Sequence, residues 1–310
     1  MNSQPASSQE SLVSVVITCY NQAHFLGEAI ESALRQTCQP SEVLVVDDGS
    51  TDTTPEVVSR YPHVGYIRQK NQGVVAARNR GLGESQGDYL VYLDGDDRLA
   101  PDALEIGLSY LSLHPEAAFV SGHCRFIDAA GAPLPAWQQK RVDGDHYLEM
   151  LRGNYIWMPA KVMFRRAAIK AVGGFDSSAD HSGDYDLYLK LTRAYPVVSH
   201  EQVVAEYRFH DANNFRRSAM MLRSALGVLR RQRGYVKDDA RREEAYRAGL
   251  KNLQDFYGEK LVEDIRAHVR ARDDWREISV GVITLLRYYP RGFFTHAGRK
   301  FRRIIGGGKD

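Results

Sequence analysis

Cysteine is scarce in this chain, and its three copies lie far apart. Cys19, Cys38 and Cys124 are the full set among 310 residues, and no pair has the C-x-x-C spacing. An odd and scattered set of thiols argues against a disulfide framework and against a cysteine-ligated zinc site. The composition therefore favours a protein of a reducing compartment.

Long apolar runs are also missing. No stretch approaches the ~20 consecutive apolar residues that a membrane-spanning helix requires. Residues 1–10 are polar and lack the basic and then apolar order of a secretory signal peptide. We therefore expect residues 1–11 to be disordered and the protein to be cytoplasmic.

The net charge is only +2, but the charges are unevenly distributed. Residues 1–210 contain 18 Lys or Arg and 26 Asp or Glu, whereas residues 211–310 contain 23 and 13. An acidic body followed by a basic tail indicates two regions with different roles.

Apolar runs and helical spacings alternate along the first hundred residues. Residues 13–17, 43–46, 64–68 and 89–93 are predicted strands, and Leu26, Ala29, Ile30, Ala33 and Leu34 recur at the spacing of one helix face. Strands alternating with helices predict an α/β fold with a mostly parallel, doubly wound sheet. Further along, residues 117–121 and 124–128 are predicted to form two strands around a turn.

Polar side chains follow three of the predicted strands, at the point where each strand ends. Parallel strands end at the same edge of a sheet, and ligands of such sheets bind there. These strand-end residues are Thr18, Tyr20, Asp47, Asp48, Asp94, Asp96 and Asp97.

The last of these clusters, Asp94-Gly95-Asp96-Asp97, admits two interpretations. Closely spaced carboxylates repel one another unless a cation lies between them, and oxygen ligands suit Mg²⁺ or Mn²⁺. The alternative is an acidic turn whose side chains are simply hydrated.

Six motifs follow one another in a fixed order and together cover about residues 12–210. They are Val15-Val16-Ile17-Thr18-Cys19-Tyr20-Asn21, Val45-Val46-Asp47-Asp48-Gly49-Ser50-Thr51-Asp52, Asn71-Gln72-Gly73 with Ala77-Arg78-Asn79-Arg80-Gly81, Tyr92-Leu93-Asp94-Gly95-Asp96-Asp97, Gly173-Gly174-Phe175-Asp176, and Gly183-Asp184-Tyr185-Asp186-Leu187. These motifs resemble those of family 2 glycosyltransferases, inverting enzymes of the GT-A fold that use nucleotide-diphosphate sugars.

The resemblance implies a donor pocket built from the strand-end loops. Tyr20 would stack on the base, Asp48 would accept a hydrogen bond from the base, and Arg78 would face ribose or phosphate. Without the resemblance, an arginine on a short helix is more often a surface charge. Asp94 would approach the ribose. The implied nucleotide- and donor-binding residues are Thr18, Tyr20, Asn21, Asp48, Arg78 and Asp94.

The resemblance also implies the catalytic groups. Asp96 and His210 would hold Mn²⁺ or Mg²⁺, and Asp184 would be the base that deprotonates the acceptor hydroxyl. His210 ends a Tyr-Arg-x-His motif in which Arg208 pairs with phosphate or forms a salt bridge; a structural histidine is the alternative. Gly183 departs from the family, which commonly has Glu before this aspartate.

The expected protein is therefore an inverting, metal-dependent glycosyltransferase with a GT-A catalytic domain at 12–214 and a basic helical region at 215–310. The donor is a nucleotide-diphosphate sugar, with a UDP-sugar favoured, and the acceptor is a saccharide or lipid-linked hydroxyl. The implied pathway is synthesis of cell-surface polysaccharide, lipopolysaccharide or glycolipid. A non-catalytic nucleotide-sugar-binding protein and a nucleotidyltransferase of related fold are the alternatives.

Basic residues interleaved with Phe and Ile mark residues 285–305. Such a segment is attracted to anionic lipid, so we expect contact with the inner face of the membrane; a helical cap on the catalytic domain is the alternative. Nucleic-acid binding is not expected, because no nucleic-acid-binding module accompanies the charge.

Overall fold

The computed structural model describes residues 12–210, 218–272 and 275–294. The predicted disorder of residues 1–11 lies outside these ranges. The chain divides into two compact units, of which the first comprises Met1–His146, Ile156–Ser177 and Lys190–Phe209 and the second comprises Tyr147–Tyr155, Ser178–Leu189 and His210–Asp310. The predicted boundary after residue 214 stays a prediction.

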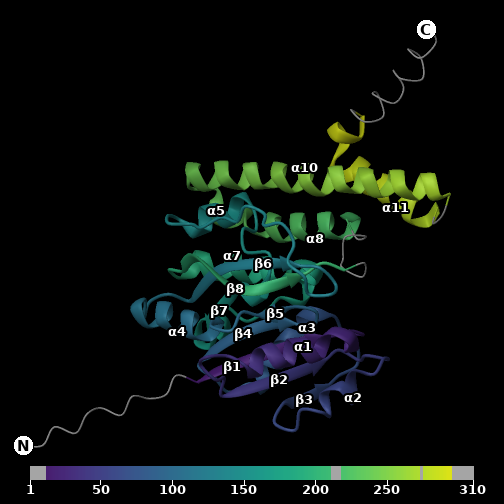
Figure 1. Cartoon of the computed structure of the whole chain (residues 1–310). Helices are drawn as coiled ribbons and strands as arrows, with labels where there is room; N and C mark the ends of the chain where they lie inside the picture. The colour runs from purple at the N-terminus through teal and green to yellow at the C-terminus, as the bar shows by residue number, and fades with distance from the viewer. Residues whose placement is uncertain (1–11, 211–217, 273–274, 295–310) are drawn as a thin grey trace, which may run out of the picture. The chain divides into compact units, whose positions relative to one another are not determined.

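Within the described residues, eight strands of the first unit form one sheet in the order β3-β2-β1-β4-β7-β6-β8-β5 (Figure 1). The strands are β1 (Val13–Cys19), β2 (Glu42–Asp47), β3 (Gly65–Arg68), β4 (Tyr89–Asp94), β5 (Arg98–Leu99), β6 (Phe119–Ile127), β7 (Val162–Arg165) and β8 (Val198–Arg208). The helices of this unit are α1 (Ala23–Leu34), α2 (Thr54–Val58), α3 (Val74–Glu84), α4 (Ala103–Leu113), the 3₁₀ helix η1 (Pro159–Lys161) and α6 (Arg166–Ala171).

The parallel half of the sheet follows the apolar runs of the sequence. β1 is buried at all seven positions, as expected for a strand with a parallel neighbour on each side. β3 is a short edge strand, and most of its residues are exposed. The predicted strands near residues 13–17, 43–46, 64–68 and 89–93 are therefore confirmed.

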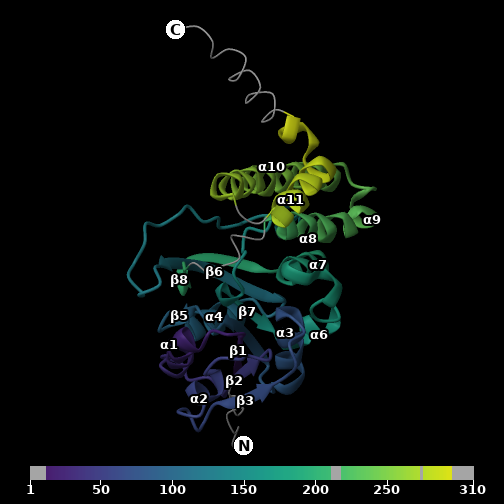
Figure 2. The same cartoon turned by 90° about the vertical axis from the view of Figure 1, so that its right-hand side faces the viewer.

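Helices cover both faces of this half, which makes it doubly wound. Figure 2 shows α1 on one side of β1 and α3 on the other. Leu26, Ala29, Ile30 and Ala33 of α1 are fully buried, as their spacing predicts. α3 lies so close to β1 that a Cβ on Gly81 would be 2.3 Å from Val16 Cγ1. This close approach of the helix to the Val16 side chain explains the glycine that ends the Ala-Arg-Asn-Arg-Gly motif.

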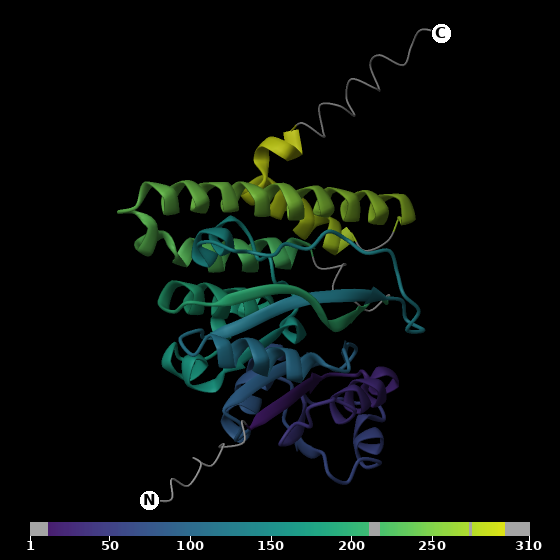
Figure 3. The same cartoon turned by 60° about the vertical axis from the view of Figure 1, so that its left-hand side comes forward.

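The other half of the sheet is mixed, which the sequence did not predict. β7 is antiparallel to both β4 and β6, whereas β6 and β8 are parallel and run side by side (Figure 3). The prediction of two strands at 117–121 and 124–128 is wrong. β6 is one strand whose register shifts at Ser121–Cys124, so a bulge replaces the expected turn. A Cβ on Gly122 would be 2.6 Å from His200 Cε1, which makes glycine necessary at the bulge.

The second unit is helical in its described part. It contains α8 (Ser218–Arg231), α9 (Arg233–Val236), α10 (Ala240–Ala271) and α11 (Trp275–Tyr288), together with most of α5 (His146–Arg152) and of the 3₁₀ helix η2 (Ser177–Ser182). α7 (Gly183–Ala194) has residues in both units. α10 packs along α8 and α11 (Figure 1). None of the described helices combines the length and apolar character needed to cross a lipid bilayer.

Lys161 is a buried cation in the first unit. Lys161 is 3% exposed, and its Nζ lies 4.7 Å from the centre of the Trp157 ring. Burial lowers the pKa of this amine from 10.5 to about 8. At pH 7 the amine is protonated in both the folded and unfolded chain, so the full cost of burying the charge is present.

Lys161→Met is therefore expected to raise the free energy of unfolding at pH 7 by on the order of 1–3 kcal/mol. Between about pH 8 and 10.5 the unfolded chain binds the proton that the folded chain has lost, so wild-type stability rises with pH there, and the variant loses that rise. Urea unfolding at pH 7 and 9.5 measures both effects, with the exposed Lys170→Met as control. Lower stability of Lys161→Met at pH 7 would contradict this account.

Candidate functional site

The carboxyl ends of β1, β2 and β4 lie level at one edge of the sheet. Thr18 faces Asp94 across the β1–β4 pair, and Cys19 faces Asp47 across the β1–β2 pair. The predicted meeting of three polar loops at one edge is therefore confirmed.

Asp94, at the end of β4, is held by donors from two neighbouring elements. Its Oδ1 accepts hydrogen bonds from Thr18 Oγ1 at 3.1 Å and from Arg78 Nη2 at 2.8 Å. Thr18 and Arg78 are 4% and 6% exposed, and Asp94 is half-buried. The structure thus brings together three of the predicted donor-binding residues. Their roles toward ribose and phosphate stay predictions.

Two of the sequence motifs meet beside this group. Asn79 Nδ2 donates to the Phe175 carbonyl at 2.8 Å, and Asn79 Oδ1 accepts from the Phe175 N–H at 3.0 Å. The Arg78 guanidinium carbon lies 5.9 Å from the centre of the Phe175 ring. The Gly-Gly-Phe-Asp loop is therefore fastened to the helix that carries Arg78.

Asp48 is buried, and its carboxylate holds the loop that leads into α3. Its Oδ1 accepts from Gln69 Nε2 at 2.7 Å and from the Gln72 N–H at 2.9 Å, and its Oδ2 accepts from the Gly73 N–H at 2.8 Å. A carboxylate offers roughly four acceptor positions, so these contacts use most of its capacity. The hydrogen bond to a base stays a prediction.

The loop after β1 is joined to the loop after β2 through Asn21. This residue has a left-handed φ of 53°; its N–H donates to Ser50 Oγ at 2.9 Å and its Oδ1 accepts from the Thr51 N–H at 2.7 Å. The preceding Tyr20 is 47% exposed. An exposed aromatic ring on a fastened loop suits stacking on a nucleobase.

Asp97, which the sequence left without a role, closes the acidic turn. Its N–H donates to the Asp94 carbonyl at 3.0 Å, and its Oδ1 accepts from the Arg208 N–H at 2.9 Å. Burial raises the Asp97 pKa well above its ordinary value, and the charges of Asp96 and Asp94 raise it further. Of the two roles expected for Arg208, the structure shows the salt bridge, which its Nη2 forms with Glu28 Oε2 at 2.7 Å.

The acidic turn fits a divalent cation that is shared with a phosphate ligand. Among the described residues, no three His, Cys, Asp or Glu side chains gather into a complete metal site. Mg²⁺ in phosphate-handling enzymes is nevertheless bound by one or two carboxylates, with phosphate oxygens and water as its other ligands. Burial is the main cause of the raised Asp97 pKa, and the charges of Asp96 and Asp94, which such a cation would offset, raise it further. Asp96, half-buried on this turn, stays the predicted ligand from the first unit.

The predicted base and the second predicted metal ligand belong to the second unit. Asp184 lies in the first turn of α7, where Asn154 Nδ2 donates to its Oδ2 at 3.3 Å. Burial raises the pKa of Tyr257 to about 12, and the Asp184 charge raises it too, so this phenol stays protonated beside the carboxylate. His210 is half-buried. The roles of Asp184 and His210 stay predictions.

Sequence patterns missed the partners of these groups. Asn154 lies in a stretch in which we predicted no site residue, and Glu28 is one of two glutamates on an amphipathic helix. Neither position carries a local signal, because each is defined by a partner 30 residues or 180 residues away in sequence.

Comparison with known proteins agrees with this geometry. The sequence model of Glycosyl transferase family 2 matches residues 14–173, more than half of the chain. Chondroitin synthase of Escherichia coli is 31% identical over 212 residues, which make up 65% of this chain and 29% of that protein. The chain thus spans less than a third of that relative's length.

Solved structures share the fold. Staphylococcus aureus TarS 1–349 in complex with UDP superposes with a TM-score of 0.60 at 18% identity, covering 77% of this chain and 70% of that one. Mannosyltransferase PcManGT from Pyrobaculum calidifontis, in complex with GDP-Man and Mn²⁺, superposes with a TM-score of 0.59 at 19% identity, covering 92% and 83%. The GT-A fold expected from the sequence is confirmed.

Proposed function

The chain belongs to glycosyl transferase family 2, and we propose that it transfers a sugar from a nucleotide-diphosphate donor to an acceptor hydroxyl with inversion at the anomeric carbon. A UDP-sugar is the favoured donor. The observation that carries the proposal is the joining of Asp94, Thr18 and Arg78 beside the acidic turn, at the edge where a doubly wound sheet binds its ligand.

The proposed donor site uses the residues at this edge. The exposed Tyr20 ring stacks on the base, Asp48 and Asn21 hold the loops that enclose it, and Arg78 and Asp94 face the ribose and diphosphate. Asp96 and His210 would hold Mn²⁺ or Mg²⁺, which, when bound, neutralises the negative charge of the departing diphosphate. The Mn²⁺ in the PcManGT complex supports the use of a divalent cation.

Asp184 is the proposed base. It takes the proton of the acceptor hydroxyl as that oxygen bonds to the anomeric carbon and the bond from that carbon to the diphosphate oxygen breaks. Its place in the first turn of α7 suits a negatively charged side chain, because helix N-termini stabilise negative charge. The hydrogen bond from Asn154 orients the carboxylate.

A thermal-shift screen of UDP-, GDP- and dTDP-sugars with Mn²⁺ tests the proposal, since a ligand that binds the native state raises its unfolding temperature. We expect the largest shift from a UDP-sugar. No shift with any of these donors would contradict nucleotide-sugar binding.

We further propose that the enzyme acts in the cytoplasm at the inner face of the membrane, in synthesis of cell-surface polysaccharide, lipopolysaccharide or glycolipid. The likeness to chondroitin synthase supports a polysaccharide product. The expected membrane contact spans residues 285–305, of which 295–305 lie outside the described residues.

The described part of the tail supports contact with anionic lipid. Trp275, Ile283 and Leu286 of α11 are 64%, 64% and 44% exposed, and their spacing sets them on one face of the helix. The exposed Arg276 and Arg287 lie beside that face. An exposed apolar face edged with arginines complements an anionic membrane surface.

Replacing Trp275, Ile283 and Leu286 together by serine is expected to reduce flotation with phosphatidylglycerol-containing vesicles by about tenfold or more, because these side chains supply the apolar burial. Leu113→Ser, at a 75% exposed position of the first unit, is the control. Wild-type protein that fails to float would contradict the proposal. Self-association that the triple variant loses, without flotation, would instead assign this face to a second copy of the chain.

A further inference from the structure

Arg208, the last residue of β8, is the largest fully buried side chain in the described part of the chain. Its Nε donates to the Asp96 carbonyl at 2.8 Å, its Nη1 donates to the Ala129 carbonyl at 3.0 Å, and its Nη2 donates to Glu28 Oε2 at 2.7 Å. All three guanidinium nitrogens thus donate to groups of the protein, and the side chain is 0% exposed. This arginine holds the acidic turn and has no exposed surface to offer a phosphate.

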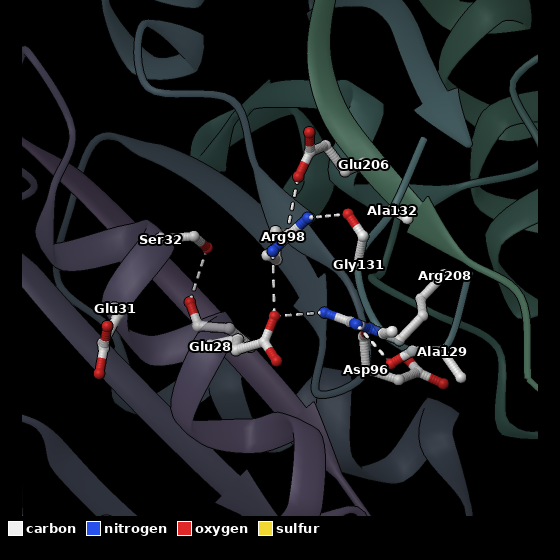
Figure 4. Close-up of polar contacts among 12 residues, drawn as sticks. Glu28, Glu31, Ser32, Asp96, Arg98, Ala129, Gly131, Ala132, Glu206 and Arg208 are labelled. Carbon is white, nitrogen blue, oxygen red and sulfur yellow. Dashed lines mark hydrogen bonds and ion pairs between the residues drawn. The ribbon is translucent and has the colours of Figure 1, made fainter. Parts of the chain in front are cut away.

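Arg98, just after the acidic turn, reaches the same carboxylate. Its Nη1 donates to Glu28 Oε2 at 3.0 Å, its Nη2 donates to the Gly131 carbonyl at 3.3 Å, and its Nε donates to Glu206 Oε2 at 2.8 Å. Figure 4 shows Glu28 of α1 between the two guanidinium groups, each of which also reaches the turn after β6.

The network offsets the negative charge gathered at the acidic turn. Asp94, Asp96 and Asp97 lie within four residues, and Asp97 is only 2% exposed. Arg208 brings a buried positive charge to this turn and bonds to it twice, through its N–H to Asp97 and its Nε to the Asp96 carbonyl. Its own charge is balanced by Glu28, so the backbone at Asp96 is fixed from α1 and from the turn after β6.

We propose that Arg208, together with Glu28, is a positioning residue that sets the Asp96 carboxylate for a divalent cation without touching the cation or the nucleotide. The inference rests on the proposed function, because it assigns a task to that cation site. It predicts that binding of Mn²⁺ weakens when the pair is disturbed, even in a variant that folds normally.

Two substitutions test the inference. Glu28→Gln keeps an acceptor at the half-exposed end of the pair but removes its charge, and Arg208→Lys keeps the charge but removes the fork of donors. Each is expected to weaken Mn²⁺ binding in the presence of UDP by about tenfold, the usual effect of losing a group that orients a metal ligand. The double variant is expected to lose little more than Arg208→Lys, because the two residues act as a unit.

Electron paramagnetic resonance of free Mn²⁺ measures the affinity, and thermal unfolding is recorded for every variant. Glu31→Gln is the matched control, since Glu31 lies on the same helix and pairs with Arg35 instead. Unchanged Mn²⁺ affinity in Glu28→Gln and Arg208→Lys would overturn the inference while leaving the proposed function intact. Weakened affinity only in parallel with lost cooperative unfolding would show a purely structural role and would also overturn it. Wild-type protein that binds no Mn²⁺ with UDP would refute the proposed function itself.

Discussion

Replacing Asp184 by asparagine is expected to slow sugar transfer by about 10³-fold, since a positioned general base contributes roughly 10²–10⁴-fold. The amide has the shape of the carboxylate and can still accept the hydrogen bond from Asn154, but it cannot take the acceptor proton. Donor binding is expected to be unchanged, because the assigned task of Asp184 concerns the acceptor. Release of nucleotide diphosphate measures the rate, and calorimetry measures donor affinity.

The matched control for this substitution is Asp255→Asn in α10, at an exposed ion pair with Lys251. This control makes the same chemical change at a position far from Asp184 in the sequence. A rate for Asp184→Asn close to that of wild type and of Asp255→Asn would rule out Asp184 as the base. It would also favour the alternative of a non-catalytic nucleotide-sugar-binding protein.

Asp96→Asn is expected to lower transfer by on the order of 10²–10³-fold, because the charge that develops on the departing diphosphate loses its metal-borne stabilisation. The substitution is nearly isosteric, and the Asp96 carbonyl still accepts from Arg208, so the turn is expected to persist. The same loss is expected when a chelator removes divalent ions from the wild type. Excess Mn²⁺ is expected to restore the chelated wild type but not the variant.

Asp102→Asn is the control for the acidic turn. Asp102 is exposed, lies six residues further along, and makes no capping hydrogen bond at the start of α4. Full activity of Asp96→Asn, or full activity of the wild type in chelator, would remove Asp96 from the metal site.

The parallel half of the sheet was predictable from the sequence, because strands that are buried on both faces appear as continuous apolar runs. β1 and β2 read as short apolar runs that end in polar loops, and their parallel pairing sets Thr18, Asp47 and Asp94 at one edge. The same pattern, together with the family motifs, predicted that Thr18, Arg78 and Asp94 would belong to one site.

The strands of the other half of the sheet are not marked by such clear apolar runs. β7 is only four residues long and pairs antiparallel on both sides, so its short run resembles any buried segment. β6 looked like two strands because its bulge interrupts the apolar pattern near Gly122. The Glu28–Arg208 pair was also not predictable, because its two residues lie 180 positions apart in the sequence.

Asp48 shows how a motif residue can be identified correctly while its contacts remain unpredicted. The family resemblance singled it out for the base, and the structure shows its carboxylate binding the Gln72 and Gly73 N–H groups. Backbone donors leave no trace in side-chain identity, so this use of the carboxylate was not visible in the sequence. These hydrogen bonds fix the loop that leads into α3, the helix that carries Arg78.

Calorimetric titration of the wild-type chain with UDP, with Mn²⁺ and after chelation, tests most directly whether this edge of the sheet is a metal-dependent nucleotide site. The account predicts a single UDP site with Mn²⁺ and binding weaker by about tenfold or more without it. Binding of equal strength in chelator, or no binding of UDP, GDP or dTDP with Mn²⁺, would contradict it.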